Sequence, residues 1–428
     1  MATIALNIDF GDLPADAEVL VAFSGGLDST VLLHTLACHH ARRLRAMHVH
    51  HGLQADADQW SQHCMQVCDA LGVALTTVRV EVARDAGTGL EASARHARHV
   101  AFDTELRDGE VLAHAHHRDD QAETFLLRAL RASGPDGLGA MRSWRRFGRG
   151  WLWRPLLHTP RSELLAYARQ HGLHWIDDPS NANTDLDRNF LRHRVLPLLR
   201  ERWPQADAAF ARSAALSADA SELLAEGDAL ALASAGTLDP HTLSRSALHA
   251  LPPARRARAL RLWIATLDLP PLPAEGIAQV ETELLGARDD AGPEFAWQGA
   301  AIRVWRDLLH ADRQQTPLPS AWQAAWDGGA PLRLPTGGTL ALQDVPGFDA
   351  PLRVHARQGG ERITLPGRTH SHALKHVLQD LGVPPWVRER MPLLSDAAGT
   401  VLAAGDVAYS AGFDTWLRAH NARLTWSD

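Results

Sequence analysis

The sequence predicts an α/β fold: a parallel-sheet domain at the N-terminus, then a mostly helical middle domain and a small C-terminal α+β domain. Three observations support this prediction. Strand-like and helix-like segments alternate over the first 131 residues, residues 211–250 are rich in Ala and Leu at helical spacing, and short strand-like pieces flank a helix at 372–381. The 428 residues leave room for two to four domains, at roughly 100–200 residues each.

The N-terminal elements follow one another as βαβ units. Short runs rich in Val, Leu and Thr predict the strands, and apolar residues at three- and four-residue intervals predict the helices. Strands are expected at 19–23, 44–49, 74–82 and 111–115, and helices at 29–42, 56–71, 91–106 and 119–131. Because this alternation requires crossover connections, the sheet is expected to be parallel with right-handed crossovers.

Changes in composition indicate the domain limits. The parallel-sheet domain is expected at 1–215, the helical middle domain at 216–310 and the C-terminal domain at 351–428. Pro, Gly, Gln and isolated Trp gather at 311–335, so 311–350 is expected to be a linker or an irregular connection.

Composition excludes several classes of protein. Hydrophobic residues make up 45% and charged residues 22%, which is typical of a folded chain rather than a disordered one. No apolar run approaches the roughly 18 residues of a membrane helix, so no membrane partner is expected. Three cysteines without a CxxC pair favour a reducing, cytoplasmic setting. The net charge of −7 by itself indicates no nucleic-acid partner, although an average can hide patches.

The strongest local signal is a glycine pair between the first strand and the first helix. The segment is Ser24-Gly25-Gly26-Leu27-Asp28-Ser29-Thr30. Glycines let the backbone approach a phosphate, and the following helix offers free N–H groups and the positive end of its dipole. The segment lacks the Gly-Lys-Ser/Thr of a Walker A loop, and it is not GxGxxG. A plain glycine turn, with Asp28 and Ser29 capping the helix, is the structural alternative.

This segment resembles the PP-loop of the ATP pyrophosphatase superfamily. Its members cleave ATP between the α and β phosphates and transfer AMP to a substrate oxygen. The resemblance implies ATP as a cofactor and a PP-loop ATPase domain at 1–215. The expected ATP-binding residues are Ser24, Gly25, Gly26, Leu27, Asp28, Ser29, Thr30 and His48. The Asp28 carboxylate suits Mg²⁺ on the phosphates, since that ion prefers hard oxygen ligands.

Four further motifs narrow the resemblance. They are Met47-His48-Val49-His50-His51-Gly52-Leu53, Gly89-Leu90-Glu91-Ala92-Ser93-Ala94-Arg95, the segment 114–124 with Asp119, Asp120, Gln121 and Glu123, and Asp177-Asp178-Pro179-Ser180-Asn181 followed by Arg188, Asn189 and Arg192. Three further segments belong to the same pattern: Arg154-Pro155-Leu156-Leu157 and, near the end of the chain, Leu374-Lys375 and residues 383–388. In this order they resemble the tRNA(Ile)-lysidine synthetase family. Ala132 and His99 depart from the common pattern, which puts only local geometry in doubt.

The resemblance implies a two-step ligation. ATP adenylates the carbonyl oxygen at position 2 of the wobble cytidine in an isoleucine tRNA with a CAU anticodon. The ε-amine of free L-lysine then attacks that carbon and expels AMP, which leaves the base lysidine. The oligomeric state stays open, with a homodimer among the alternatives.

A pair of carboxylates is the candidate lysine site. Asp120 and Glu123 stand three residues apart on one face of a predicted helix start. Carboxylates can bind an ammonium group or take a proton from it. The resemblance assigns lysine recognition to these two residues, so Asp28, Asp120 and Glu123 are the candidate catalytic residues. An acidic cap that favours the helix dipole is the structural alternative.

Residues 128–154 are the candidate tRNA surface in this acidic chain. They carry seven arginines against one acid, with Trp and Phe interleaved and glycines typical of a mobile loop. Arginine can bind phosphates and aromatic rings can stack on bases. The candidate tRNA-binding residues are Arg128, Arg131, Arg145, Arg146, Arg188, Arg192, Lys375 and Arg388. An exposed loop over packed aromatics is the alternative.

Several of these arginines have an alternative use. Arg188 and Arg192 could instead pair with the nearby Asp177, Asp178 and Asp187. A second cluster at 255–261 lies on a predicted helix and is either an RNA contact or a solvated face. Lys375 is the only lysine of the chain, and the resemblance implies an acceptor-stem contact for it and Arg388.

Three rival functions remain at this point. A tRNA thiolase of the same superfamily needs a reactive cysteine or iron–sulfur ligands, whereas Cys64 and Cys68 are typical of buried small hydrophobes on a helix. A catalytically silent RNA-binding protein would not need Asp28, Asp120 and Glu123. An ammonia-using synthetase would need a glutaminase nucleophile, for which the sequence offers no context.

Overall fold

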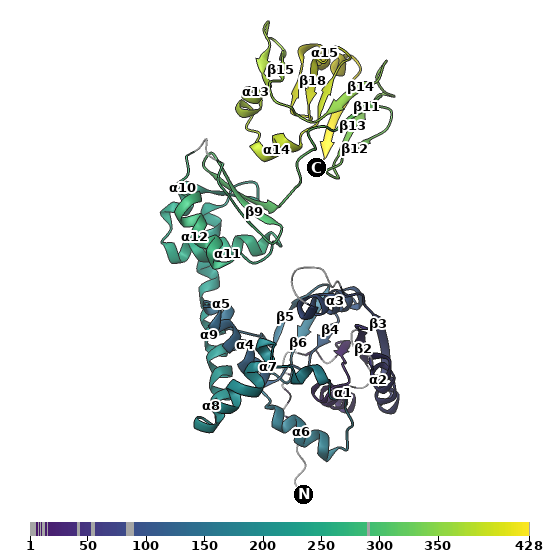
Figure 1. Ribbon diagram of the computed structural model, residues 1–428, viewed down its shortest axis with the longest axis vertical. Helices are drawn as coiled ribbons and strands as arrows, with labels where there is room; N and C mark the ends of the chain where they lie inside the picture. The colour runs from purple at the N-terminus through teal and green to yellow at the C-terminus, as the bar shows by residue number, and fades with distance from the viewer. Residues whose placement is uncertain are drawn as a thin grey trace. The chain divides into compact units, whose positions relative to one another are not determined.

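The computed structural model describes residues 6, 8, 10, 13, 14, 16–40, 43–52, 56–82, 90–288 and 292–427. The chain divides into two compact units, Met1–Ala225 and Glu226–Asp428, and their boundary falls within the long helix α9, Ala206–Ala235 (Figure 1). Arg42, Leu53 and Gly89, which enter the sequence predictions, lie outside the described residues. Over the described ranges, no helix combines the length and the apolarity that a membrane crossing requires.

A six-stranded sheet forms the centre of the first unit. Its order is β3-β2-β1-β4-β6-β5, and every pairing is parallel except that of β5 with β6. The strands are β1 Val19–Ala22, β2 Leu44–His50, β3 Ala74–Arg79, β4 Val111–Ala113, β5 Trp144–Phe147 and β6 Gly150–Trp153. This confirms the predicted α/β class with its parallel sheet.

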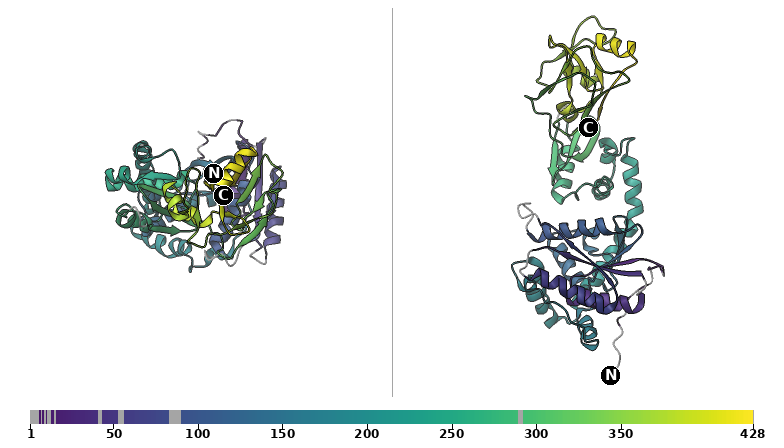
Figure 2. Two further views of the ribbon diagram at one scale, coloured as in Figure 1. Left: turned by 90° about the horizontal axis from the view of Figure 1, so that it is seen from above. Right: turned by 90° about the vertical axis from the view of Figure 1, so that its right-hand side faces the viewer.

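Helices cover both faces of this sheet, as the second view of Figure 2 shows. The α-helices of this part of the chain are α1 Leu27–His40, α2 Ala57–Leu71, α3 Leu90–Glu105, α4 Arg118–Leu130, the short α5 Pro135–Leu138 and α6 Arg161–Gln170. Val19 and Val21 of β1 belong to the core with α1 and α2, whereas Leu20 between them belongs to the core with α3. Alternate residues of a strand face opposite sides, so a strand covered on both sides is apolar throughout.

Short helical turns close the first unit. They are the 3-10 helix η2 Pro179–Ala182, α7 Asp187–Phe190, the π-helical segment η3 Leu191–Val195 and α8 Leu196–Arg202. A π-helical turn within an α-helix is rare and frequently marks a functional position. Here it carries Arg192.

The residues 128–154 are more ordered than the expected loop. The short helix α5 lies in this segment, and β5 and β6 form an antiparallel hairpin at the edge of the sheet. Trp153 is buried and stacks on Trp144, and the Arg146 guanidinium lies 4.0 Å from the ring centre of Trp151. Part of the aromatic content is therefore core, because β6 pairs directly with β4.

The second unit begins with helices and an antiparallel sheet of order β7-β10-β9-β8. Its elements are β7 Thr242–Ser244, α10 Arg245–Ala250, α11 Pro253–Thr266, α12 Ala274–Gln279, the π-helical segment η4 Val280–Leu284, β8 Glu294–Trp297, β9 Ala300–Trp305 and β10 Leu308–Arg313. The predicted helical middle region is thus accompanied by a sheet. In β9 the side chains of Ile302 and Val304 are buried and Arg303 between them is partly exposed, which is the alternation of a strand. The sequence predicts helices here and no sheet.

The remaining residues form sheets of five, three and two strands, with orders β11-β14-β17-β18-β19, β12-β13-β20 and β15-β16. The elements are β11 Gln323–Trp326, β12 Leu332–Arg333, β13 Thr339–Gln343, β14 Leu352–His355, β15 Arg362–Ile363, β16 His372–Ala373, α13 Leu374–Asp380, α14 Pro385–Arg390, β17 Leu393–Ser395, β18 Val401–Ala404, β19 Ala408–Tyr409, α15 Ala411–Ala419 and β20 Arg423–Ser427. The segment 311–350, expected as a linker, therefore contains β11, β12 and β13. The four-part division itself stays a prediction.

Candidate active site

The glycine pair forms a tight turn between β1 and α1. Gly25 has φ +81°, and a Cβ there would lie 2.9 Å from Cys64 Sγ and from Ile176 Cδ1. Glycine is required at this position because both the backbone angle and the space exclude a side chain. The carbonyl oxygen of Gly25 accepts a hydrogen bond from the Ile176 N–H at 2.9 Å, which holds the turn against the 176–181 segment.

Hydroxyl groups organise the same turn. The Ser29 Oγ donates to the Gly26 carbonyl oxygen at 3.0 Å and lies 3.0 Å from the Ser24 Oγ. Thr30 is buried, and its Oγ1 lies 3.4 Å from the Gly25 carbonyl oxygen, to which it donates. The first turn of α1 thus presents its free N–H groups beside two hydroxyls, which is an anion-binding arrangement.

A cavity of about 420 Å³ opens at the carboxyl ends of the parallel strands. It is lined by Ser24, Gly26, Leu27, Asp28, Ser29, His48, His116, Asp120, Arg161 and Arg192, among others. Ligand sites of open parallel sheets lie at this edge. The structure therefore brings six of the eight predicted ATP residues into one cavity with Asp120, whereas Gly25, Thr30 and Glu123 are not part of its lining.

His117 connects Asp28 to Asp120. Its Nε2 lies 3.6 Å from Asp28 Oδ2 and 3.4 Å from Asp120 Oδ2. His117 is also the N-cap residue of α4. Its Nδ1 accepts a hydrogen bond from the backbone N–H of Asp120, and its backbone N–H donates to Asp120 Oδ2. Burial opposes its charge, but Asp120 and Asp28 outweigh that effect and raise the pKa of His117.

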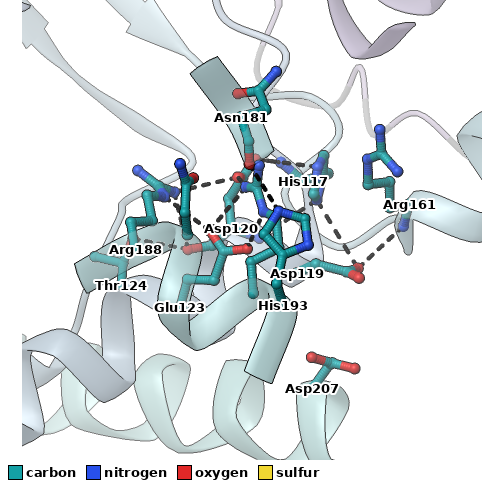
Figure 3. A network of polar contacts seen from close by, with 12 residues as sticks. His117, Asp119, Asp120, Glu123, Thr124, Arg161, Asn181, Arg188, His193 and Asp207 are labelled. Atoms are coloured by element: carbon teal, nitrogen blue, oxygen red, sulfur yellow. Dashed lines mark hydrogen bonds and ion pairs between the residues drawn. The ribbon is translucent and has the colours of Figure 1, made fainter. Parts of the chain in front are cut away.

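Asp120 and Glu123 are buried and are held by Arg188, which Figure 3 labels beside them, and by Arg192. Arg192 Nε lies 2.6 Å from Glu123 Oε1, and its Nη2 lies 2.9 Å from Asp120 Oδ1. Arg188 Nε lies 2.8 Å from Glu123 Oε2, and its Nη2 lies 3.2 Å from Asp120 Oδ1. Two guanidinium groups thus neutralise the two carboxylates from one side.

This pairing differs from the alternative that the sequence left open. Asp177, Asp178 and Asp187 are near in sequence, but Arg188 and Arg192 instead contact α4, from which 65 to 72 residues separate them. Burial disfavours the Asp120 carboxylate, yet the charges of His117 and Arg188 hold its pKa well below its ordinary value. Asp120 is therefore ionised at neutral pH.

Asp28 stands at the phosphate side of the cavity. Its Oδ1 is buried with no hydrogen-bond partner among the described residues, and Arg161 Nε lies 3.8 Å from it. A buried carboxylate oxygen without a donor fits a hard divalent cation such as Mg²⁺. Asp119, beside Asp120 in the sequence, has a structural role instead, because it accepts the Arg161 N–H and pairs with Arg200.

His48 lines the cavity, whereas Cys64 and Cys68 belong to the hydrophobic core of the first unit. His48 is buried, its Nδ1 donates to the Phe23 carbonyl oxygen at 3.0 Å, and burial lowers its pKa. Cys64 and Cys68 are fully buried, and burial raises the pKa of each thiol to about 12. These thiols have neither the exposure nor the ionisation of a nucleophile.

The predicted tRNA residues fall in different settings. Arg131, Arg145 and Arg146 are exposed, and Arg128 is half-buried with its Nη1 on the Gly137 carbonyl oxygen at 2.8 Å. Lys375 is exposed, whereas Arg388 is buried and donates to the Val383 carbonyl oxygen at 2.7 Å.

The second arginine cluster is largely structural. Arg255 and Arg258 pair with Asp228 at 2.9 and 2.7 Å, and Arg256 pairs with Glu281 at 2.7 Å. These three side chains stabilise the packing of α11 rather than present free charge.

Three family models match the chain. A PP-loop domain matches residues 5–199, a TilS substrate binding domain matches 243–310 and a TilS substrate C-terminal domain matches 352–426. Relatives named tRNA(Ile)-lysidine synthase match almost the whole length. In Xanthomonas campestris pv. campestris strain 8004 the identity is 56%, covering 97% of each chain. It is 54% in Xylella fastidiosa strain Temecula1, covering 95% of this chain and 94% of the relative, and 40% in Methylococcus capsulatus, covering 94% and 92%.

Proposed function

The chain belongs to the tRNA(Ile)-lysidine synthase family, and from this membership we propose how its residues join free lysine to an isoleucine tRNA with a CAU anticodon. The observation that carries the proposal is the single cavity that holds both the phosphate loop and Asp120. An adenylated base and an attacking amine must meet at one carbon, so the two half-sites need to adjoin.

In the first step the carbonyl oxygen at position 2 of the wobble cytidine attacks the α-phosphorus of ATP, and pyrophosphate leaves. The N–H groups at the start of α1 and the Ser24 and Ser29 hydroxyls bind the phosphates. Asp28 and its unpartnered Oδ1 would hold Mg²⁺ there. When bound, that ion neutralises phosphate charge and assists departure of pyrophosphate.

In the second step the lysine ε-amine attacks carbon 2, loses a proton and expels AMP. Asp120 and Glu123 bind the ammonium group and accept that proton. Arg188 and Arg192 now occupy the carboxylate oxygens that a lysine ammonium would contact. Lysine therefore has to share these oxygens with the guanidinium groups or displace them.

The tRNA contacts are proposed for both units. In the first unit the proposed tRNA contacts are Arg128, Arg131, Arg145 and Arg146, with Arg188 and Arg192 beside the reacting base. In the C-terminal domain they are Lys375 and Arg388. We also propose domain boundaries near residues 215, 310 and 350 and a cytoplasmic location. A homodimer is one alternative for the oligomeric state.

The rival thiolase reading is disfavoured by the cysteines. Sulfur transfer needs an accessible thiolate or a cluster ligand set. Cys64 and Cys68 are buried with pKa values near 12, and neither lines the cavity.

The test is ATP–pyrophosphate exchange with the full chain, followed by addition of labelled lysine. Unmodified CAU isoleucine tRNA is compared with CAU methionine tRNA and with no RNA. Exchange that needs the isoleucine tRNA, followed by lysine bound covalently to that RNA, is the expected result. RNA-dependent AMP formation without incorporation of lysine would contradict lysine as the nucleophile.

A further inference from the structure

Arg154 is a buried cation without a counter-ion. It follows β6, is 8% exposed, and donates from Nε to His116 Nδ1 at 3.2 Å and from Nη1 to the Arg142 carbonyl oxygen at 2.7 Å. Within the part of the chain that the structure describes, no carboxylate lies within 4.0 Å of its guanidinium. An uncompensated buried charge is strongly unfavourable, so a compensating anion is expected in the functional state.

Its charged neighbours have the same sign. The pKa of Arg154 is lowered to about 10. Burial is the main cause, and the positive charges of Arg145, Arg95 and Arg128 add to it. The positive charge of a buried arginine is ordinarily compensated by a carboxylate. The buried Arg256 of the second unit is an example, because it forms an ion pair with Glu281 at 2.7 Å. Arg154 has no such ion pair in the described residues, and the charges that act most strongly on it are positive.

His116 links this charge to the cavity of the phosphate loop. It lines that cavity and stacks on His114 with ring centres 5.2 Å apart. Because its Nδ1 accepts from Arg154, a neutral His116 carries its proton on Nε2. Burial lowers the pKa of His116 to about 3. The Asp120 carboxylate opposes this shift, whereas the charges of Arg154, Arg188 and Arg95 add to it, so the ring stays neutral at physiological pH. Nε2 has no partner in the described ranges.

We propose that Arg154 and His116 form a phosphoryl-binding site in this cavity, where Arg154 supplies positive charge and fixes His116 as an Nε2–H donor. The ligand is a phosphoryl oxygen, from either the α-phosphate of the nucleotide or a phosphodiester of the RNA. Arg154 acts through His116 and is a positioning residue. The inference rests on the proposed function for the identity of these two ligands, but its test needs only binding.

The test measures two affinities separately for Arg154→Gln, Arg154→Lys and His116→Gln. Calorimetry gives the Kd for ATP with Mg²⁺ and no RNA, and filter binding gives the Kd for CAU isoleucine tRNA without ATP at several salt concentrations. Loss of a charge-assisted contact raises one Kd by about 10- to 100-fold in Arg154→Gln. Arg154→Lys, which keeps the charge, is expected to recover part of the loss.

The two sources give different results. A nucleotide ligand shifts only the ATP Kd, whereas an RNA ligand shifts the tRNA Kd and lowers its salt slope by about one unit. Arg256→Gln is the matched control for loss of a buried arginine and leaves both Kd values within about twofold of wild type. These results stand whether or not lysine is ligated, so failure of the proposed function is distinguishable.

A spectroscopic measurement on the wild-type chain tests the inference even if the variants fail to fold. Nitrogen-15 spectra of histidine in the wild-type chain are expected to report His116 as the neutral Nε2–H form at pH 6. A protonated ring or an Nδ1–H form would overturn the inference, as would folded Arg154→Gln with both Kd values unchanged.

Discussion

The Arg192 guanidinium lies 2.6 Å from the Glu123 carboxylate, Nε to Oε1, and this contact joins a π-helical turn to the buried face of α4. The carboxylate is 1% exposed, so it cannot depend on water for compensation. The structure thus shows a guanidinium at the group proposed to recognise lysine. It follows that stability and substrate recognition share the same four side chains, since Arg188 and Asp120 complete the network.

Glu123→Gln is expected to weaken lysine recognition more than adenylation. Removing one charge-assisted contact costs about 1.5–3 kcal/mol, so the KM for lysine should rise by about 10- to 100-fold. Pyrophosphate exchange should stay within about threefold of wild type, because Glu123 is not among the residues that line the cavity around the phosphate loop. Steady-state lysine incorporation and exchange are measured on the same preparation, with the exposed Glu163→Gln as control. Equal loss of both activities would contradict a lysine-specific role.

Arg192→Gln should destabilise the first unit. It leaves two buried carboxylates with one arginine, and breaking a buried ion pair costs about 3–5 kcal/mol. The double variant Arg192→Gln/Glu123→Gln should lose less than the sum of the single losses, because neither charge is then left alone. Urea unfolding of the four proteins gives the coupling free energy. Strict additivity would mean that the 2.6 Å contact contributes nothing.

Asp28→Asn should abolish adenylation with only a small loss of stability. The Asp28 Oδ1 has no donor among the described residues, and the contact of Oδ2 with His117 Nε2 is long, at 3.6 Å. Pyrophosphate exchange is expected to fall at least about 100-fold, and part of the activity should return at high Mg²⁺ if the carboxylate binds that ion. Exchange at several Mg²⁺ concentrations and a thermal melt are the measurements. Unchanged exchange would leave Asp28 as a helix cap.

Replacement of all three cysteines should leave ligation intact. In the wild-type protein at pH 8, iodoacetamide should modify Cys38, which is exposed, and spare Cys64 and Cys68, whose thiols are buried with pKa values near 12. Mass spectrometry of native and denatured samples counts the labels. Cys38→Ser with Cys64→Ala and Cys68→Ala should be less stable by about 1 kcal/mol per buried site but still incorporate lysine. An inactive yet folded triple variant would revive the thiolase alternative.

The protein should lose stability in mild acid. Burial, followed by the charge of Arg98, lowers the pKa of His51 from 6.5 to about 4. Between those pH values the unfolded chain binds a proton that the folded chain does not, so the free energy of unfolding falls as the pH drops from 6.5 to 4. His51→Gln should reduce this slope in urea titrations at pH 7, 6 and 5. The same substitution at the exposed His158 is the control, and an equal slope in His51→Gln and wild type would contradict the assignment.

Much of the first unit was accessible from the sequence because its signals are local. The expected helix at 29–42 is α1, Leu27–His40, and the expected strand at 44–49 is β2, Leu44–His50. The sheet β7-β10-β9-β8 was not predicted, because its strands, such as β9 with Ala300 and Ala301, carry small residues that also suit helices. Sequence periodicity cannot separate such segments when both states bury the same residues.

The sequence alone determined the phosphate loop, because a strand, Gly25-Gly26 and a helix start form that turn within a few residues. Only the tertiary structure decided the partners of charge: Arg192 pairs with Glu123 from 69 residues away, Arg256 pairs with Glu281, and Arg154 has no carboxylate within 4.0 Å in the described residues. The physical reason is that backbone preferences act between near neighbours, whereas an ion pair depends on which side chains the packed core brings together.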